Sequence, residues 1–506
     1  MTVACEPGIH IGRDYHVFEQ QGMKLMISVD RSRVVKLADD NLFTVLAEYE
    51  QLNGDAQLGI EAAVSRQPWS TQEKAETLEA LAQIAPLTLR PPGIKPYVPD
   101  VSKTTVEQIR FNHVTLMVSG ACNLRCKYCY TGLQIDKHDE ALMSEDVARQ
   151  AVQLICRHIT DRHHSIGLTF FGGEPLLNFP LVRAMIHHVE AKAIELGKTP
   201  FFTLTTNGTL LTPEIIEFLE AHRCVILVSL DGPQQVHDAV RVFPDGSGSH
   251  AIVLRNLKLI KQMTGHCHVR ATRMPDGPPW EQLLDYFEAL GVTPPVSTAA
   301  VMDTEDNIDS ASLGDPRQVF EALNGPAPKL REREYQQLVS GEAPMRDAVA
   351  RWMGEFNRSD SLAYKYQCSA FSSHLAVGPD GALYPCHRFW PMPAYELGNV
   401  RDGIDIDKFR AGLQQFHEVV AQKCIPCWAR FLCGGECPRH RATAQGFRPP
   451  HDYECEASRR RWEQAAAYFV RMAEEHPDVL CNLANPPRQD SDYSGHDRPP
   501  GLDVPS

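Results

Sequence analysis

The chain lacks any apolar run that approaches the ~20 residues a membrane helix requires. Its first residues, Met-Thr-Val-Ala-Cys-Glu-Pro, also lack the basic and then apolar pattern of a signal peptide. We therefore expect a soluble protein of the cytoplasm. With a formal net charge of −14, the chain has no excess of Lys and Arg for binding a phosphate backbone. Neither nucleic acid nor a membrane is expected among its partners.

The length and composition are those of a globular protein with several domains. The chain has 506 residues, of which 43% are hydrophobic and 23% are charged. Cytoplasmic thiols stay reduced, so the 15 cysteines are better explained as metal ligands and core residues than as disulfides. Cys156, Cys224 and Cys267 lie in apolar patterns and are expected in the core.

Three closely spaced cysteines lie in one loop, and the loop contains no fourth cysteine. Cys122, Cys126 and Cys129 have the spacing C-x3-C-x2-C. A [4Fe-4S] cluster ordinarily takes four Cys thiolates, so a set of three can leave one iron free to bind a substrate or cofactor. The alternatives are a zinc site or an electron-transfer cluster, but zinc sites usually combine one Cys pair with a second, and none lies nearby.

This loop resembles the signature of radical S-adenosylmethionine (SAM) enzymes. The resemblance implies a [4Fe-4S] cluster whose free iron is chelated by the amino and carboxylate groups of SAM. It also implies that one electron breaks the sulfonium to give a 5′-deoxyadenosyl radical, which removes a substrate hydrogen. A low-potential donor such as flavodoxin or ferredoxin would supply that electron.

Segments of strand and helix character alternate from about residue 112 to 301. Strands are expected at 113–118, 166–171, 201–205, 225–229, 268–271 and 296–301, with helices between them, for example at 144–160, 180–196 and 212–222. The alternation predicts an α/β fold, a partial (β/α)6 barrel like part of a TIM barrel. Active sites of such barrels lie at the C-terminal ends of the strands, and the Cys loop directly follows the first strand.

Polar motifs follow the next three strands. The run Gly172-Gly-Glu-Pro175 resembles the GGEP motif of the same family, in which the backbone and the Glu receive the SAM amino group. In the family, residues behind the third and fourth strands contact the ribose and carboxylate of SAM. The positions that match SAM contacts are Tyr128 (near the adenine), Gly172, Gly173, Glu174, Pro175, Thr206, Asn207, Ser229 and Arg241. Asn-Gly and Asp-Gly are also common turns, and Ser229 and Arg241 have a turn and a surface position as alternatives.

A second group of cysteines resembles the SPASM extension, which carries two auxiliary [4Fe-4S] clusters in radical SAM enzymes that modify peptides and proteins. Its members here are Cys368, Cys386, Cys424, Cys427, Cys433, Cys437 and Cys455. By position, the distal cluster would take Cys424, Cys427, Cys433 and Cys455, and the proximal one Cys368, Cys386 and Cys437. The proximal set is one thiolate short, so it has an open iron or recruits His374, His387 or a distant Cys. Zinc knuckles are the alternative.

The flanking regions complete the expected domain organisation. Residues 1–90 have strands at 15–19, 24–29 and 34–37 and helices at 40–52 and 71–84. An exposed edge of such a sheet can take a peptide as an added strand, and the unit resembles leader-recognition domains of peptide-maturing enzymes; a structural cap is the alternative. The other units are a linker (91–110), the barrel (111–305), bridging helices (306–360), the SPASM domain (361–460) and a C-terminal helix with a disordered tail (461–506).

The resemblance narrows the substrate to a peptide or protein. In sulfatase-maturing relatives an Asp follows the second SPASM cysteine and acts as the base, whereas His387 stands here, which disfavours formylglycine formation. His387 is the candidate proton acceptor because histidine titrates near neutrality, with a packed histidine as the alternative. We expect a radical SAM maturase that forms an intramolecular cross-link, preferably a thioether, in a ribosomally made precursor peptide. A sulfatase-type protein oxidase and a non-catalytic iron–sulfur electron carrier are the rivals.

Overall fold

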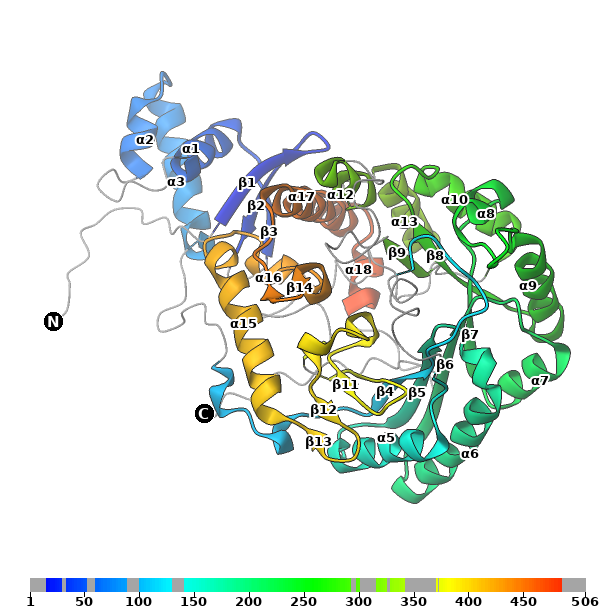
Figure 1. The fold of residues 1–506 in the computed structure, drawn as a ribbon. Helices are drawn as coiled ribbons and strands as arrows, with labels where there is room; N and C mark the ends of the chain where they lie inside the picture. Colours follow the sequence, from blue (N-terminus) through cyan, green and yellow to red (C-terminus); the bar gives the residue numbers. More distant parts are fainter. Residues whose placement is uncertain are drawn as a thin grey trace.

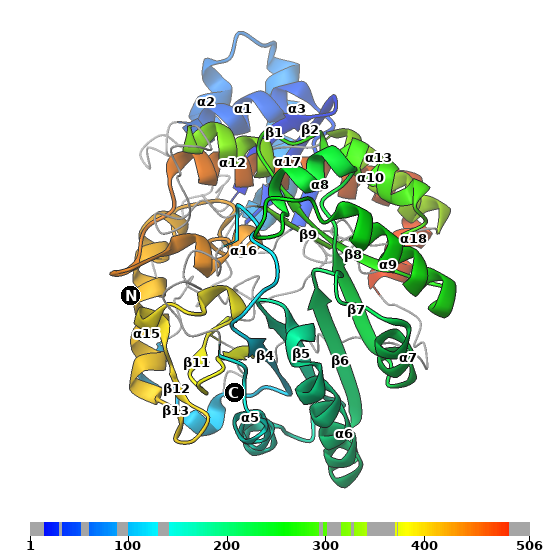
Figure 2. The same cartoon turned by 45° about the vertical axis from the view of Figure 1, so that its right-hand side comes forward.

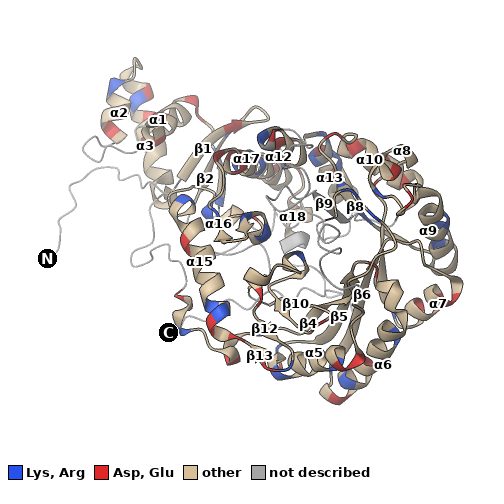
Figure 3. Cartoon of the chain, in the orientation of Figure 1, with Lys and Arg blue, Asp and Glu red and all other residues tan. Residues whose placement is uncertain are grey.

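The computed structural model describes residues 15–29, 33–51, 60–88, 100–129, 141–292, 297–300, 315–324, 328–341, 370–371 and 373–484. A curved sheet with helices on its outer side forms one half of the molecule, and the N-terminal and C-terminal segments form the other (Figure 1). Acidic and basic residues are interspersed on the described outer helices (Figure 3). No helix among the described residues is both long enough and apolar enough to cross a membrane.

The central sheet confirms the predicted partial barrel. Its six successive parallel strands are β4 (His113–Ser119), β5 (Ser165–Gly172), β6 (Thr199–Thr206), β7 (Cys224–Ser229), β8 (His268–Arg273) and β9 (Ser297–Ala300) (Figure 2). Most residues of β4, β6 and β7 are buried, as in a parallel sheet covered by helices, whereas only Val269 and Ala271 are buried in β8.

Two further strands of this sheet come from the cysteine-rich region. β10 (Leu375–Val377) pairs in parallel with β4, and β11 (Leu383–Tyr384) pairs antiparallel with β10. Neither strand could be predicted from the sequence, because strands of three and two residues show no periodicity. This pairing places the residues after β11 beside the first strands of the barrel.

The outer layer consists of α5 (Glu145–His158), α6 (Phe179–Leu196), α7 (Pro213–Ala221), α8 (Gln234–Val240), α9 (His250–Thr264) and α10 (Trp280–Ala289). Local sequence sets their ends. The Ser144 side chain accepts a hydrogen bond from Val147 N, and Thr212 caps α7 in the same way. Gly197 ends α6 in the left-handed conformation, at φ 63°. The expected core cysteines Cys224 and Cys267 are buried, and Cys156 is half-buried.

The N-terminal unit contains the expected sheet, β1 (Tyr15–Gln20), β2 (Met23–Ser28) and β3 (Arg33–Lys36), with helices α1 (Asp40–Gln51), α2 (Ile60–Arg66) and α3 (Thr71–Thr88). Alternation along β2 directs Met26 toward the helices of the unit, whereas Leu25 and Ile27 pack against Trp462 of α17 (Asp452–Glu475). The sheet is therefore covered on both faces.

The C-terminal region extends the same hydrophobic core as the barrel, since Phe389, Phe416 and Phe447 cluster with the sheet residues. Its other elements are β12 (Gly398–Asn399), β13 (Gly403–Ile404), α15 (Ile406–Cys424), α16 (Arg430–Cys433), β14 (Ala442–Thr443), β15 (Gly446–Phe447) and α18 (Pro477–Ala484). Within the predicted bridging region, α12 (Pro316–Asn324) and α13 (Pro328–Ser340) are helical. The Pro-rich stretch 89–99 and the tail from 485 lie outside the described residues.

Candidate active site

The Cys loop leaves the C-terminal end of β4 and is held by backbone hydrogen bonds. The amide of Arg125 donates to the carbonyl of Val242 at 2.7 Å, and that of Lys127 donates to Val240 at 2.9 Å. These bonds join the loop to the end of α8, behind the fourth barrel strand. All three thiols are half-buried, so the loop presents them together at the expected edge of the sheet.

The surroundings of the three sulfurs suit thiolate ligands. Burial, with a smaller contribution from the neighbouring thiols, raises the pKa of Cys122 to about 12 and that of Cys126 to about 11. Leu124 N and Asn207 Nδ2 donate to Cys122 Sγ at 3.4 and 3.8 Å. The Arg241 guanidinium beside Cys126 opposes the rise there. Thiols that are costly to ionise alone, but that have donors aimed at them, fit a site completed by a metal cluster.

Glycines let the end of β5 approach this loop. The amides of Gly173 and Glu174 donate to the carbonyls of Ser119 and Ala121 at 2.8 and 2.9 Å. A Cβ on Gly173 would lie 2.2 Å from the Ala121 oxygen, so only glycine fits. The Gly172-Gly-Glu-Pro175 motif therefore abuts the first cysteine directly.

Glu174 connects the ends of β5 and β6. Its fully buried carboxylate accepts hydrogen bonds from Thr206 Oγ1 and Asn207 N, both at 2.7 Å, and from Leu176 N at 3.0 Å. Burial raises the pKa of this carboxyl to about 7, against the effect of the hydrogen bonds. Because Asn207 Nδ2 in turn donates to Asn123 Oδ1 at 2.8 Å, Glu174 positions Asn207 over the Cys loop.

Asp231 joins three parts of the site by hydrogen bonds, a role that was not predicted from the sequence. It is 1% exposed and accepts hydrogen bonds from Tyr128 Oη at 2.6 Å, Arg241 Nε at 2.8 Å and Thr272 N at 2.8 Å. The Arg241 guanidinium also lies 5.3 Å from the centre of the Tyr128 ring, a cation–π arrangement. Two features of the sequence could have indicated its role. Asp231 lies just behind the fourth strand, and it precedes by ten residues Arg241, which needs a partner if it is buried.

The structure brings the predicted SAM-contact residues to one edge of the barrel. Pro175 begins the 3-10 helix η3 (Pro175–Asn178), and Ser229 ends β7 with 8% of its surface exposed. Arg241 is buried and paired with Asp231, so the alternative of a surface position is wrong. The contacts of these residues with SAM stay predictions.

His387 lies in the 3-10 helix η4 (His387–Phe389), with its ring centre 4.7 Å from that of Phe171 at the end of β5. Burial, together with Arg270 and Arg388, lowers its pKa well below the usual value. These surroundings disfavour the imidazolium, which argues against the expected near-neutral pKa. Its role as a proton acceptor stays a prediction.

Within the described residues, the C-terminal cysteines lie close together in pairs, and each pair comes from one of the expected sets. Burial and then the nearby Cys437 raise the pKa of Cys386. In the other set, Cys433 lies near Cys424, and Cys455 lies near Cys427. Hydrogen bonds also reach these sulfurs, from Ser458 Oγ to Cys433 at 3.1 Å and from Ala429 N to Cys427 at 3.4 Å. Cys368 lies outside the described residues, and the ligation of auxiliary clusters stays a prediction.

Comparison with known proteins agrees with this geometry. Residues 116–296 match the Radical SAM superfamily. The serine-type anaerobic sulfatase-maturating enzyme of Bacteroides thetaiotaomicron is 26% identical over 395 residues, which cover 71% of this chain and 90% of that protein. The radical SAM cyclopropyl synthase TigE of Paramaledivibacter caminithermalis is 30% identical over 169 residues, 31% of this chain and 34% of that protein.

The solved structure of anSMEcpe with bound AdoMet shares the fold, with a TM-score of 0.60 and 20% identity over 74% of this chain and 98% of that chain. Fold and site geometry thus agree with the family match. Residues 116–296 therefore form a radical SAM domain, and the chain is similar in sequence to anaerobic sulfatase-maturating enzymes.

Proposed function

We propose that this protein is a radical SAM maturase that introduces an intramolecular cross-link, a thioether in preference to a carbon–carbon bond, into a ribosomally made peptide. The observation that carries the proposal is the proximity of two cysteine regions. β10 pairs with β4, whose end carries the Cys loop, and His387, next to Cys386, contacts Phe171, next to Gly172. A peptide bound at this edge would therefore meet both the SAM-binding loop and the proximal cysteine set.

In this proposal Cys122, Cys126 and Cys129 hold a [4Fe-4S] cluster. When bound, the cluster and SAM supply a 5′-deoxyadenosyl radical that removes a hydrogen from a peptide carbon. The chain itself orients the cofactor, because Glu174 fixes Asn207 beside Cys122 and Asp231 fixes Arg241 beside Cys126. Hydrogen bonds hold these buried donors in place, which favours preorganised binding of the cofactor.

The proximal set would favour the thioether. Cys386 and Cys437 are neighbours, and the third predicted ligand, Cys368, leaves the set one thiolate short of four. A substrate thiol that completes this set would be held deprotonated and close to the carbon radical. Four protein thiolates at this position would contradict that part of the proposal.

Formylglycine formation in a sulfatase is the second candidate, and the similarity along 90% of the Bacteroides enzyme favours it. Formylglycine formation at a serine and thioether formation at a cysteine each remove two hydrogens. Mass alone therefore does not separate these two products. An aldehyde-reactive hydrazide labels only formylglycine. Protection of a cysteine from alkylation, without hydrazide labelling, indicates the thioether.

The test uses anaerobically reconstituted protein with dithionite, SAM and two sets of peptides. One set contains a sulfatase-type Cys or Ser segment, and the other contains short peptides encoded beside the gene. We expect a peptide of the second set to lose two hydrogens and its alkylatable thiol. An aldehyde on the sulfatase peptide would replace the first proposal by the second candidate, and an unmodified peptide without 5′-deoxyadenosine would contradict both.

A further inference from the structure

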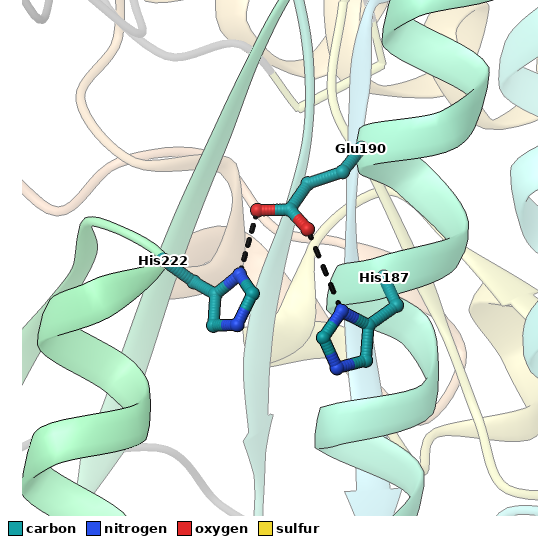
Figure 4. A group of neighbouring side chains, drawn as sticks. All are labelled: His187, Glu190 and His222. Carbon is teal, nitrogen blue, oxygen red and sulfur yellow. Dashed lines mark hydrogen bonds and ion pairs between the residues drawn. The ribbon is translucent and has the colours of Figure 1, made fainter.

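A second group of ligating side chains lies on the outer helical layer. His187 and Glu190 belong to α6, and His222 caps the C-terminal end of α7. Figure 4 shows both imidazole rings directed at the Glu190 carboxylate. His222 Nδ1 lies 2.7 Å from one carboxylate oxygen, and His187 Nδ1 lies 3.6 Å from the other.

The spacing of these atoms suits one small cation. One ligand atom of each residue lies within 4.8 Å of the other two. Zinc bound at ~2.0–2.2 Å in a tetrahedron places its ligands ~3.3–3.6 Å apart, so shifts of about an ångström or less convert the hydrogen-bonded group into a coordination site. The i, i+3 relation of His187 and Glu190 already puts both side chains on one face of α6.

Aromatic packing holds the two imidazoles. The ring of Phe218 lies 5.5 Å from that of His187 and 4.4 Å from that of His222, while Arg183 covers Phe218 at 4.9 Å. The histidine rings themselves meet edge to face at 4.7 Å. Preorganised ligands lose less entropy on binding a metal, so this packing favours a site over a chance surface contact.

The donor set selects the metal. Two imidazoles and one carboxylate suit zinc and its late transition-metal neighbours, whereas calcium and magnesium prefer oxygen ligands alone. The side chains of His187, Glu190 and His222 are 55%, 31% and 20% exposed, which leaves the fourth position to water.

We propose that His187, Glu190 and His222 bind a zinc ion that ties α6 to the end of α7 and stabilises the barrel. His222 lies two residues before Cys224, which begins β7, so the site belongs to the N-terminal end of the strands. The Cys loop lies at the opposite end. In barrels of this type the N-terminal end serves stability and the C-terminal end serves catalysis, which assigns the zinc a structural role.

The test compares three forms of the cluster-loaded protein: wild type, the double variant His187→Ala, His222→Ala, and the control His188→Ala. His188 is a neighbour on α6 that faces away, toward Arg149, at 2.8 Å. Each form is equilibrated with zinc, desalted and analysed for zinc by mass spectrometry. Thiols that bind zinc outside the site are common to all three, so only the difference counts. We expect the wild type and the control to retain one more zinc per chain than the double variant.

The Glu190→Gln variant covers the case in which the double variant does not fold, since Gln keeps the size of the side chain and removes its charge. Zinc should raise the thermal midpoint of the wild type and of His188→Ala, and should leave that of Glu190→Gln unchanged. An anomalous peak at the zinc edge between the three side chains would support the site directly. Equal zinc contents in all forms, or equal midpoint shifts, would overturn the proposal.

Discussion

The burial of the Asp231–Arg241 ion pair predicts how much stability is lost when one partner is changed. Asp231 is 1% exposed and Arg241 is 8% exposed, and the carboxylate takes donors from Tyr128 and Thr272 as well. Asp231→Asn keeps the shape but removes the charge and turns an amide toward these donors. Breaking a buried pair by changing one partner costs about 3 to 5 kcal/mol, whereas an exposed pair contributes ~0 to 1 kcal/mol.

We therefore expect Asp231→Asn to lower the free energy of unfolding of the barrel by about 3 to 5 kcal/mol. The double variant Asp231→Asn, Arg241→Met should recover most of this loss, because it no longer leaves a buried guanidinium without its counter-charge. Iron incorporation should stay below that of the wild type in both variants, since Arg241 no longer supports Cys126 in the wild-type geometry.

The assay is urea unfolding followed by hydrogen exchange, which reports the barrel separately from the other units. The exposed pair of Arg149 and Glu145 supplies the control, because Glu145→Gln should cost less than about 1 kcal/mol. A cost below ~1 kcal/mol for Asp231→Asn, or a double variant less stable than the single one, would refute the reasoning from burial.

Three further predictions concern the approach of the loops and the docking of the N-terminal unit. Gly173→Ala should prevent cluster assembly, measured as iron content, because its Cβ would overlap the backbone of the Cys loop. Glu174→Gln should raise the KM for SAM about 10-fold, or ~1.4 kcal/mol, with unchanged iron content, since it disturbs the position of Asn207. Burial lowers the pKa of His16, but hydrogen bonds to Glu463 and Glu50 raise it overall. Docking of the N-terminal unit against α17 should therefore be strongest below pH ~6.5. It should weaken as the pH rises through the pKa of His16 in the folded protein, measured as increased proteolysis of the N-terminal unit.

Each of these predictions has its own control. Gly197→Ala places a Cβ in open space and should leave iron content unchanged, so a matching loss there would contradict the steric argument. Iron lost from Glu174→Gln would show that the carboxylate supports the fold rather than the SAM position. His16→Gln removes the titrating group, and a pH dependence that survives this change would exclude His16 as its origin.

Much of the barrel could be predicted because its signals are local. Most of the strands contain a short apolar run, and the glycines and polar residues behind β4 to β7 mark the loops that meet at one edge. Apolar alternation also predicted the three strands of the N-terminal unit.

The features that sequence reasoning missed depend on long-range contacts. β10 pairs with β4 across more than 250 residues of chain, and its three residues carry no periodic pattern. Asp231 contacts both Tyr128 and Arg241 only because α8 folds back onto the Cys loop. The pKa of His387 depends on Arg270 from a different strand. The grouping of His187 and Glu190 with His222 likewise requires two helices to lie side by side.

The central claim is that Cys122, Cys126 and Cys129 hold the cluster that cleaves SAM. The most direct measurement is 5′-deoxyadenosine release, together with iron and sulfide content, in reconstituted wild type and in the variant with all three cysteines changed to Ala. The account predicts release by the wild type, and a variant with about four fewer irons and no release. A variant that still cleaves SAM, or a fully iron-loaded wild type that does not, would contradict it.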